Sequence, residues 1–491
     1  MMIGLPNPTP RLGTRSTVSN LLAKSGNPLQ STIHRSERIA PTGESCSRND
    51  AMIDLRSARL VATVAPEQWF GGYDRNAGLK ELSNLERALG CTFYRFDVAP
   101  FFEGNETAQW QAVEDLRAFA PQAALGLPNA GYPLLCRVRV GHRRVNVFTE
   151  VLGIPTILPW DHAILQFPSL ILGPLPDVPE YSAEGAILRV RVQLDHPLYH
   201  HLALDSGHVS EMRRIGLLTS ENVTFVPTQV YKPYIDHGLG LDGKRSFDND
   251  LMFAGNVYLS RSANIFPEGS LAGQCASAVV NGRRADPTAA AWRLLASHVE
   301  AMSGDCREAA HLGYDHTYFW NVAYKVVEDI ANTHSRIEVL RALKSPVSFY
   351  GGFSDPESMP RLCELLPHVR YRGSVDFADD LPGVYARSRI LVDAVNAGFI
   401  DNTSPKGPCC FAAGGFALFE YKADFARCFG DIAEHVMYRS LDDLNGKIDY
   451  FLTHEQERIE LSNHFRTLLI KEHDFYSVCG RALLRVLDAQ A

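Results

Sequence analysis

The chain has 491 residues, of which 45% are apolar and 21% charged, and its formal net charge is −8. This length exceeds what one hydrophobic core usually supports, so the sequence predicts more than one domain. The negative net charge argues against a general affinity for DNA, RNA or anionic membranes, which depends on a basic surface. No apolar run approaches the roughly 18 residues of a membrane span.

The first 55 residues differ in composition from the rest and are rich in Ser, Thr, Asn, Pro and Arg. They lack the apolar core of a signal peptide, so we expect a disordered tail over 1–55. Met52 precedes a clean domain start and is an alternative to Met1 as the natural first residue. The ten cysteines show no C-x-x-C spacing. This favours reduced, buried thiols in a cytoplasmic protein over a metal site.

From residue 59 onward, short apolar runs alternate with stretches of helical periodicity. Strands at this spacing, separated by helices, predict βαβ units and a parallel sheet. Residues 56–228 are therefore expected to form a Rossmann-like domain. Its expected strands are 60–64, 92–96, 123–127, 155–158, 202–205 and 223–227, and its helices include 76–89, 107–120 and 145–152.

The same pattern returns after a polar, glycine-rich linker over 229–250. Residues 251–491 are expected to form a second Rossmann-like domain, interrupted at about 262–344 by a helical insertion. The fold class is thus α/β, with two Rossmann-like domains facing a cleft. The expected strands of the second domain are 251–255, 347–351, 369–371, 390–392, 416–419 and 435–438.

Three short patterns favour structural over functional interpretations. Residues 238–243 fit G-x-G-x-x-G, but no strand precedes them, so the pattern indicates a linker and not a dinucleotide site. Residues 248–250 fit D-x-D but come before a strand, which disfavours a metal–diphosphate loop. The basic cluster over 137–144 is expected to be a solvated face, with an anionic acceptor as the alternative.

Asp161 and His162 directly follow an expected strand of the first half. In open α/β sheets, ligands bind beyond the carboxyl ends of the strands. The pair could act as a catalytic base and its orienting group, or Asp161 could simply cap a helix. The residues alone leave both interpretations open. Residues 205–208 occupy an equivalent position, where they could help to line the cleft or, through Asp205 or Ser206, cap a helix.

The most informative stretch is 401–420, which joins a polar loop, a short helix of small residues, a double glycine and an apolar strand. Amides at a helix N-terminus favour anions, and Ser404 and Lys406 would add a donor and a charge. Gly414 and Gly415 permit a sharp turn or a close approach to a ligand. Glu420 would lie at a strand end, within reach of a ribose. An ordinary turn between helix and strand explains the same residues equally well.

Residues 369–487 resemble the C-terminal glycosyltransferase domain of the CgeB-like (spore-maturation) proteins. The matching phrases are "VRYRGSVDFADDLPGVYARSRILVDAVN", "SPKGPCCFAAGGFALFEYKADFARCF", "VMYRSLDDLNGKIDYFL" and "HDFYSVCGRALLRVL". Residues 251–258, "LMFAGNVY", resemble the opening strand of that domain. The family typically has an Arg-Phe-Glu-like step before the small-residue helix, whereas residues 407–411 of this chain contain no carboxylate.

The resemblance implies GT-B architecture, with a nucleotide-sugar donor held mainly by the C-terminal half and no bound metal. It places Gly255 and Asn256 near the diphosphate and Glu420 near the ribose. The residues that it implies along the donor site are Ser404, Lys406, Gly414 and Gly415.

We therefore expect a glycosyltransferase that needs no cofactor and moves a sugar to a carbohydrate, lipid or protein acceptor, with Asp161 or His162 as the base if the reaction inverts. No nucleic-acid partner is expected, whereas peripheral membrane association and homo-oligomers are compatible with the sequence. One rival is a nucleotide-sugar epimerase or phosphorylase on the same fold. The other is a non-catalytic sugar-binding or assembly protein, which the missing carboxylate favours.

Overall fold

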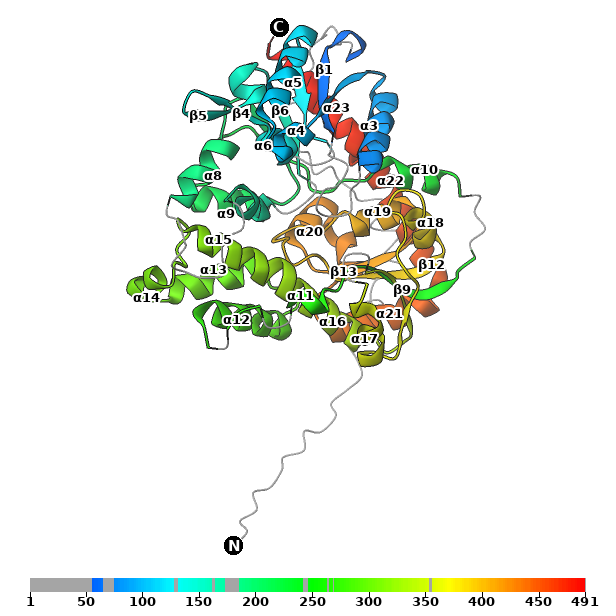
Figure 1. The fold of residues 1–491 in the computed structure, drawn as a ribbon. Coiled ribbons are helices and arrows are strands. Elements are labelled where there is room, and N and C mark those ends of the chain that lie inside the picture. Colours follow the sequence, from blue (N-terminus) through cyan, green and yellow to red (C-terminus); the bar gives the residue numbers. More distant parts are fainter. Residues whose placement is uncertain are drawn as a thin grey trace. The chain divides into compact units, whose positions relative to one another are not determined.

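Two six-stranded sheets organise the chain (Figure 1). The computed structural model describes residues 55–64, 75–127, 131–160, 164–172, 185–241, 246–262, 265–267, 269–352 and 356–490. Of the tail expected over 1–55, all but Leu55 lies outside the described residues. Both sheets are parallel throughout, which confirms the predicted α/β class with two Rossmann-like halves.

The first sheet has the strand order β2-β1-β3-β6-β7-β8. Its central strand β1 (Leu60–Val64) is buried at all five positions, as expected for a strand that helices cover on both faces. The other strands are β2 (Phe93–Asp97), β3 (Ala123–Leu125), β6 (Thr156–Pro159), β7 (Tyr199–Ala203) and β8 (Val223–Phe225). The helices between them are α3 (Arg75–Leu89), α4 (Ala99–Glu103), α5 (Glu106–Phe119), α6 (Gly131–Leu135), η3 (Ile164–Gln166), α7 (Phe167–Leu172), α8 (Ala186–Leu194) and α9 (Ser206–Arg214).

The second sheet has the strand order β11-β10-β9-β12-β13-β14. Its strands are β9 (Asn249–Gly255), β10 (Val347–Gly351), β11 (Val369–Tyr371), β12 (Ser388–Asp393), β13 (Ala417–Glu420) and β14 (Met437–Tyr438). The chain order reverses between β9 and β12, so a topological switch point lies between the ends of these two strands, where open α/β sheets bind ligands. The accompanying helices are α17 (Ser358–Leu365), α18 (Leu381–Ala386), α19 (Lys406–Ala412), α20 (Ala423–Phe429), η6 (Gly430–His435), α21 (Leu441–Thr453) and α22 (Glu455–Glu472).

A group of helices separates β9 from β10. It comprises α11 (Leu259–Ser262), α12 (Leu271–Ala285), α13 (Ala291–Ala301), α14 (Gly304–Ala309), α15 (Thr317–Tyr324), the π-helical segment η5 (Lys325–Ala331) and α16 (Asn332–Ala342). The last three follow one another without a break and form one long helix over 317–342. Trp292, Phe319 and Trp320 of this group share a hydrophobic core with the first half, including residues of η3, α7 and α8.

The C-terminal helix α23 (Phe475–Asp488) packs against the first sheet, next to α3, β3 and β6 (Figure 1). The hydroxyl of Tyr476 donates to Glu81 of α3 at 2.7 Å. A Cβ at Gly480 would lie 2.6 Å from Leu89, so the glycine allows the two helices to approach. The sequence analysis assigned residues 251–491 to the second domain. It did not predict that the C-terminal helix would return to pack against the first sheet.

Residues 137–151 differ from the helix expected over 145–152. They form a β-hairpin, β4 (Arg137–Val140) and β5 (Arg143–Asn146), followed by the short π-helical segment η2 (Val147–Val151). Gly141 has a φ of +61°, which allows the tight turn. The side chain of Asn146 accepts from the amides of Phe148 and Thr149, so the helical turn begins only after it. The hairpin therefore carries the basic cluster of 137–144.

Asp205, at the end of β7, joins the two halves. Its buried carboxylate caps α9 by accepting from the amides of Gly207 and His208. It also accepts from the amides of residues 400, 401 and 402, which follow β12 in the second half. The helix-cap interpretation of 205–208 is thus confirmed, and the same carboxylate holds the loop after β12.

We predict that stability falls as the pH drops from about 6.5 to about 4, in part through His201 of β7. Trp160 donates its indole N–H to Nδ1 of His201 at 3.0 Å, so this ring nitrogen must stay unprotonated. Burial lowers the pKa of His201 to about 4, against its ordinary 6.5, and the bond to the Leu194 carbonyl offsets only part of this. In this pH range the unfolded chain therefore takes up a proton that the native chain does not. This uptake lowers the free energy of unfolding by up to about 3 kcal/mol.

Urea unfolding at pH 7.5 and pH 5 measures this effect. His201→Gln is expected to reduce the pH dependence, whereas His142→Gln, on the exposed hairpin turn, serves as the control and should leave it unchanged. An unaltered pH dependence in His201→Gln would contradict the assignment.

Candidate functional site

The switch point of the second sheet brings together the ends of β9 and β12. Gly255 ends β9, and Asn256 follows it. The side-chain oxygen of Asn256 accepts from the amide of Gly352 at 3.0 Å, which ties the end of β9 to the end of β10. Asp393 ends β12 and is completely buried. Of the predicted residues, Gly255 and Asn256 are therefore located at the switch point.

Two further predicted residues, Ser404 and Lys406, converge on Asp393 at the start of α19. Lys406 Nζ lies 2.5 Å from one carboxylate oxygen of Asp393 and 3.3 Å from the carbonyl of Ala254. The hydroxyl of Ser404 donates to the other oxygen at 3.3 Å. Burial lowers the pKa of Lys406, and the carboxylate of Asp393 opposes that shift. The predicted charge and donor are thus present at the switch point, beside the end of β9.

Arg336 of α16 is a second cation at this point, which sequence reasoning missed. Its guanidinium donates to the backbone carbonyl of Asn256 and is about 94% buried. Within the described residues, its Nε has no hydrogen-bond acceptor. A Cβ at Gly255 would lie 3.8 Å from both the Arg336 guanidinium carbon and Lys406 Nζ. Both cations therefore lie within van der Waals distance of the space next to the Gly255 backbone.

Glu420 lies at the end of β13, as predicted, but it is occupied by protein partners. Arg283 of α12 donates to both carboxylate oxygens, at 3.2 and 2.9 Å, and Lys422 lies 3.0 Å from one of them. Burial alone would raise the pKa of Glu420, but the two cations outweigh it, and the pKa is lowered. A ribose would have to share this carboxylate with Arg283, which the sequence did not indicate.

A cavity of about 240 Å³ opens beside Glu420. It lies between α12, α16 and the start of α21, so the helices inserted after β9 form most of its wall. Its position at the carboxyl end of the second sheet makes it a candidate space for a nucleoside. The polar residues that line it are Arg283, Arg284, His334, Ser335, Glu338, Glu420, Ser440 and Asp442.

Gly414 and Gly415 lie at the opposite end of α19 from Lys406 and precede β13. Gly414 has a φ of +88°, and a Cβ there would overlap Leu241. A Cβ at Gly415 would lie 2.8 Å from the carbonyl of Tyr385 and 2.6 Å from the sulfur of Cys410. The structure thus gives both glycines a role in turning and packing the chain, and it does not bring them to the switch point.

The predicted pair Asp161 and His162 lies outside the described residues. The first described residue after them, Ile164, donates its amide to Nδ1 of His208 at 3.1 Å. The imidazole of His208 also bonds the carbonyl of Gly398, in the loop after β12, at 2.7 Å. The chain that follows the predicted pair is therefore tied to the second half.

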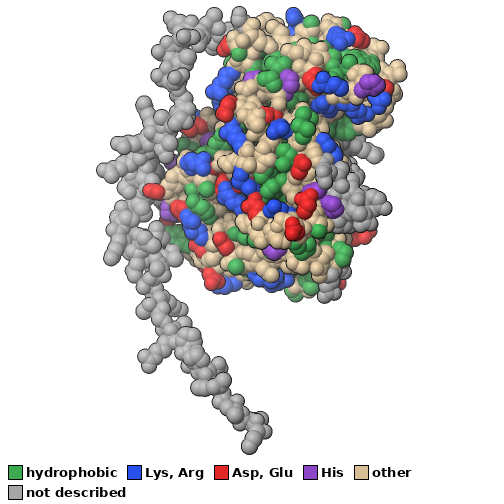
Figure 2. Space-filling view, turned by 90° about the vertical axis from the view of Figure 1, so that its left-hand side faces the viewer, with side chains coloured by type: hydrophobic (Ala, Val, Ile, Leu, Met, Phe, Trp, Pro, Cys, Tyr) green, Lys and Arg blue, Asp and Glu red, His purple; other side chains and the backbone are tan. Residues whose placement is uncertain are grey.

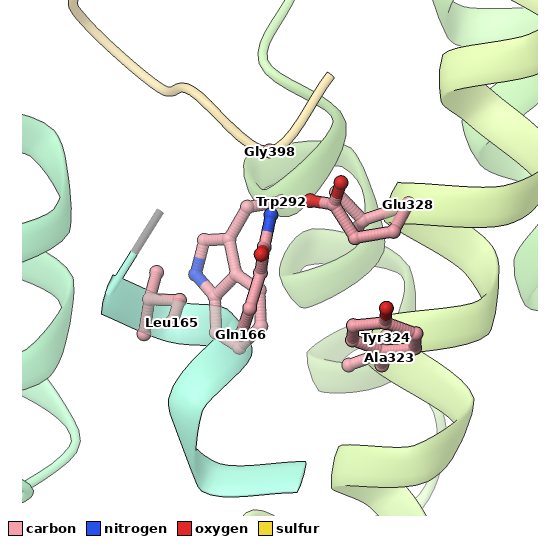
Figure 3. A pocket seen from close by; sticks show the side chains of 8 residues that line it. Leu165, Gln166, Trp292, Ala323, Tyr324, Glu328 and Gly398 are labelled. Atoms are coloured by element: carbon pink, nitrogen blue, oxygen red, sulfur yellow. The ribbon is translucent and has the colours of Figure 1, made fainter. Parts of the chain in front are cut away.

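A small junction pocket lies where these segments meet (Figure 3). Leu165 and Gln166 come from the first half, and Gly398 comes from the loop after β12. Trp292 and Glu328 come from the inserted helices, and the Glu328 carboxylate points towards Gly398. The side-chain Nδ2 of Asn396 donates to the Glu328 carboxylate at 3.1 Å. The other lining residues are Ala323, Tyr324 and Val327.

The distribution of charge and of metal-ligating side chains bears on other kinds of site. On the face seen in Figure 2, acidic and basic side chains are interspersed. Within the described ranges, no group of three or more His, Cys, Asp or Glu side chains is arranged to hold a metal ion. Among the helices of that same part of the chain, none combines the length and apolarity needed to cross a bilayer.

One family model matches part of the second half. Residues 336–481 match a family model described as "Glycosyl transferase-like". The match agrees with the predicted activity. It covers β12, Lys406 and Glu420, whereas β9 with Gly255 lies before it. No curated protein matches the sequence.

Several solved glycosyltransferases are similar in structure at low identity. A glycosyltransferase from Rickettsia africae is 11% identical with a TM-score of 0.49, and the match covers 88% of this chain and 98% of that one. Anabaena Alr3699/HepE, in complex with UDP, is 7% identical with a TM-score of 0.45, over 88% and 100%. MurG from Acinetobacter baumannii is 11% identical with a TM-score of 0.32, over 88% and 99%.

We predict that Arg283→Met destabilises the protein by about 3 kcal/mol or more, because it leaves Glu420 buried with only one of its two cations. Arg341→Met is the control, since its side chain is 54% exposed and its ion pair with Glu338 should contribute at most about 1 kcal/mol. Urea unfolding measures both. The double variant with Glu420→Gln is expected to recover part of the loss. Equal destabilisation by the two single variants would contradict a buried, essential pair.

Proposed function

We propose that the chain transfers a sugar from a nucleotide-sugar donor, whose diphosphate binds at the switch point. The observation that carries this proposal is the pair of cations, Lys406 and Arg336, which both lie beside Gly255 at the end of β9. Asp393 is the carboxylate shared by these two cations. A diphosphate would add negative charge next to both cations, and the carboxyl end of a parallel sheet is the expected place for it.

In the proposed reaction, the bond between the anomeric carbon and the diphosphate oxygen breaks as the acceptor oxygen bonds to that carbon. The diphosphate leaves with the electron pair, so its growing charge must be stabilised. We propose that Lys406 and Arg336 have this role and that they serve in place of a metal ion. The acceptor's proton requires a base, for which Asp161 and His162 remain our candidates.

The finer assignments follow from the same domain. We propose a CgeB-like glycosyltransferase, because the quoted phrases between residues 369 and 487 overlap the matched region. The acceptor is proposed to be a carbohydrate, lipid or protein. A cytoplasmic location is supported by the buried, unpaired thiols, for example Cys409, whose pKa burial raises to about 12.

The alternative of a non-catalytic binding protein rests on α19, which contains no carboxylate. Cys410 is fully buried there and packs beside Gly415. This position therefore cannot contribute an acidic group to the reaction. Binding of a nucleotide sugar without turnover, across a broad panel of acceptors, would favour this alternative.

We predict that one of UDP, GDP, dTDP or CDP raises the melting temperature of the wild-type protein by a few degrees at about 100 times its Kd, where binding contributes about 2.7 kcal/mol. The shift should shrink in Lys406→Ala and in Arg336→Met, because each removes a phosphate-facing cation. Lys471→Ala, with a side chain that is 76% exposed, is the matched control and should keep the full shift.

The measured quantity is the difference in melting temperature with and without nucleotide, so a lower melting temperature of a variant does not obscure it. The same shift in the presence of EDTA tests the proposed independence from metal. If no nucleotide stabilises the wild type, or if both cation variants keep the full shift, the proposed donor site is wrong.

A further inference from the structure

The hairpin formed by β4 and β5 is a concentrated source of positive charge in the first half. Four arginines and one histidine lie within residues 137–144, and no acidic residue occurs between Asp115 and Glu150. The four cations are all arginines, although lysine would serve equally well on a face that only needs to be solvated. On a chain with a net charge of −8, this hairpin is a local reversal of sign.

The strand register places two of these arginines directly opposite each other. Arg139 pairs with Arg144, and Val138 pairs with Val145. Opposite residues of an antiparallel pair share a face, and successive residues alternate between faces. Val138 is completely buried, so its pair faces the core and the two arginines lie on the outer face. Like charges in directly opposite positions destabilise a sheet, so the fold alone gives no reason for this pairing.

Neighbouring carboxylates compensate this charge only weakly. Arg139 Nε lies 3.5 Å from Glu106, and the two side chains are 61% and 55% exposed. Arg143 lies 3.8 Å from Glu150 and is 80% exposed. Within the part of the chain that the structure describes, no carboxylate forms an ion pair with Arg144. Ion pairs this exposed contribute little, so the outer face of the hairpin retains charge that an anionic partner can neutralise.

The hairpin is anchored, so its arginines are presented on a fixed ribbon. The buried side chain of Asn146 donates to the carbonyl of Pro133 at 2.7 Å and accepts from the amides of Phe148 and Thr149. β4 and β5 lie at the outer edge of the first half, on the segment that leads to β6 (Figure 1). The predicted base, Asp161 or His162, follows the end of β6.

The composition of the hairpin favours a narrow polyanion. Side chains opposite each other lie about 5 Å apart, and each guanidinium can bind a carboxylate through two parallel hydrogen bonds. Residues 137–146 contain no aromatic side chain, which disfavours single-stranded nucleic acid, whose bases stack on such rings. Val140 at the turn is 50% exposed, but membrane-surface segments insert larger apolar side chains over a longer face.

We propose that the outer face of the β4–β5 hairpin binds an acidic polysaccharide, with Arg139 and Arg144 each holding carboxylates of that chain. The choice of a carbohydrate rests on the proposed function, for which it narrows the acceptor to a carboxylated glycan. The presence of an anion-binding surface rests on the hairpin alone.

Isothermal titration calorimetry tests this surface with polygalacturonate, which has one carboxylate per sugar, and with neutral dextran. At 0.15 M salt the wild type should bind polygalacturonate and not dextran, and added salt should weaken the binding. Arg139→Gln should lower the affinity up to about fivefold, the value of one exposed ion pair. Arg144→Glu should lower it at least about tenfold, because it removes one contact and adds repulsion. Arg341→Gln is the control, since its side chain in the second half is 54% exposed, and it should bind like the wild type.

The melting temperature separates a binding role from a structural one. Arg144→Glu replaces two like charges with an opposite pair across the hairpin, so the melting temperature should stay the same or rise while polysaccharide binding falls. A clearly lower melting temperature in Arg139→Gln and Arg144→Glu, with unchanged binding, would assign these arginines to the fold and overturn the proposal.

The remaining outcomes distinguish this inference from the proposed donor site. Arg144→Glu should keep the full melting shift with nucleotide, because the hairpin lies outside the donor site. If a nucleotide stabilises the wild type but polygalacturonate does not bind, the donor site stands and the hairpin surface is wrong. Duplex DNA or phosphatidylglycerol vesicles that bind as tightly as polygalacturonate would overturn the choice of a polysaccharide. Binding of polygalacturonate that depends on Arg144, in a protein that no nucleotide stabilises, would support the surface and reject the donor site.

Discussion

The carboxylate of Asp205 is the interaction on which the arrangement of the candidate site depends. It accepts five backbone N–H groups, two at the start of α9 and three from residues 400–402 of the second half. Burial would raise its pKa, but His208 and these amides outweigh it, and the pKa is lowered, so the group stays ionised in the core. Asn402 adds bonds from its side chain to the carbonyls of Leu204 and Pro227. Because the loop after β12 is held in this way, both Gly398 and the start of α19 have fixed positions relative to the first half.

Charge is distributed unevenly in the core of the second half. Asp393 interacts with Lys406 and Arg336, and Glu420 interacts with Arg283 and Lys422, so each of these two carboxylates faces two cations. Burying cations in excess of their partners is costly unless a ligand completes the set. The two clusters differ, however, in how fully their cations are bonded. At Glu420, Arg283 and Lys422 both contact the carboxylate. At Asp393, the Nε of Arg336 lacks an acceptor within the described residues. This contrast favours the switch point, and not the Glu420 cluster, as the place where an anion binds.

The sequence predicted both sheets because apolar runs such as 60–64 and 251–255 are local patterns, and parallel pairing follows from their alternation with helices. The resemblance to the CgeB-like proteins also assigned Lys406 and Asn256 to one donor site, and both lie near the end of β9. Arg336 and Arg283 could not be found in this way. They lie on helices whose position is set by long-range packing, and nothing in the neighbouring sequence marks an arginine that will be buried. Gly414 and Gly415 are the opposite case. A double glycine that contacts a ligand cannot be distinguished by sequence from one that forms a tight turn, and the structure places these two in a turn against Leu241 and Tyr385.

The inserted helices connect these observations. The long helix over 317–342 contributes Tyr324 and Glu328 to the junction pocket, Arg336 to the switch point, and Ser335 and Glu338 to the cavity beside Glu420. One rigid element thus reaches all three parts of the candidate site, so a shift of this helix would change them together. The hydrophobic core that Trp292 and Phe319 share with η3 and α7 resists such a shift. A family pattern that covers only the second sheet would include the site residues at the strand ends, but not those on the inserted helices. In this chain the other side is built by the inserted helices, which contribute Arg336 to the switch point and Arg283 to the cluster around Glu420.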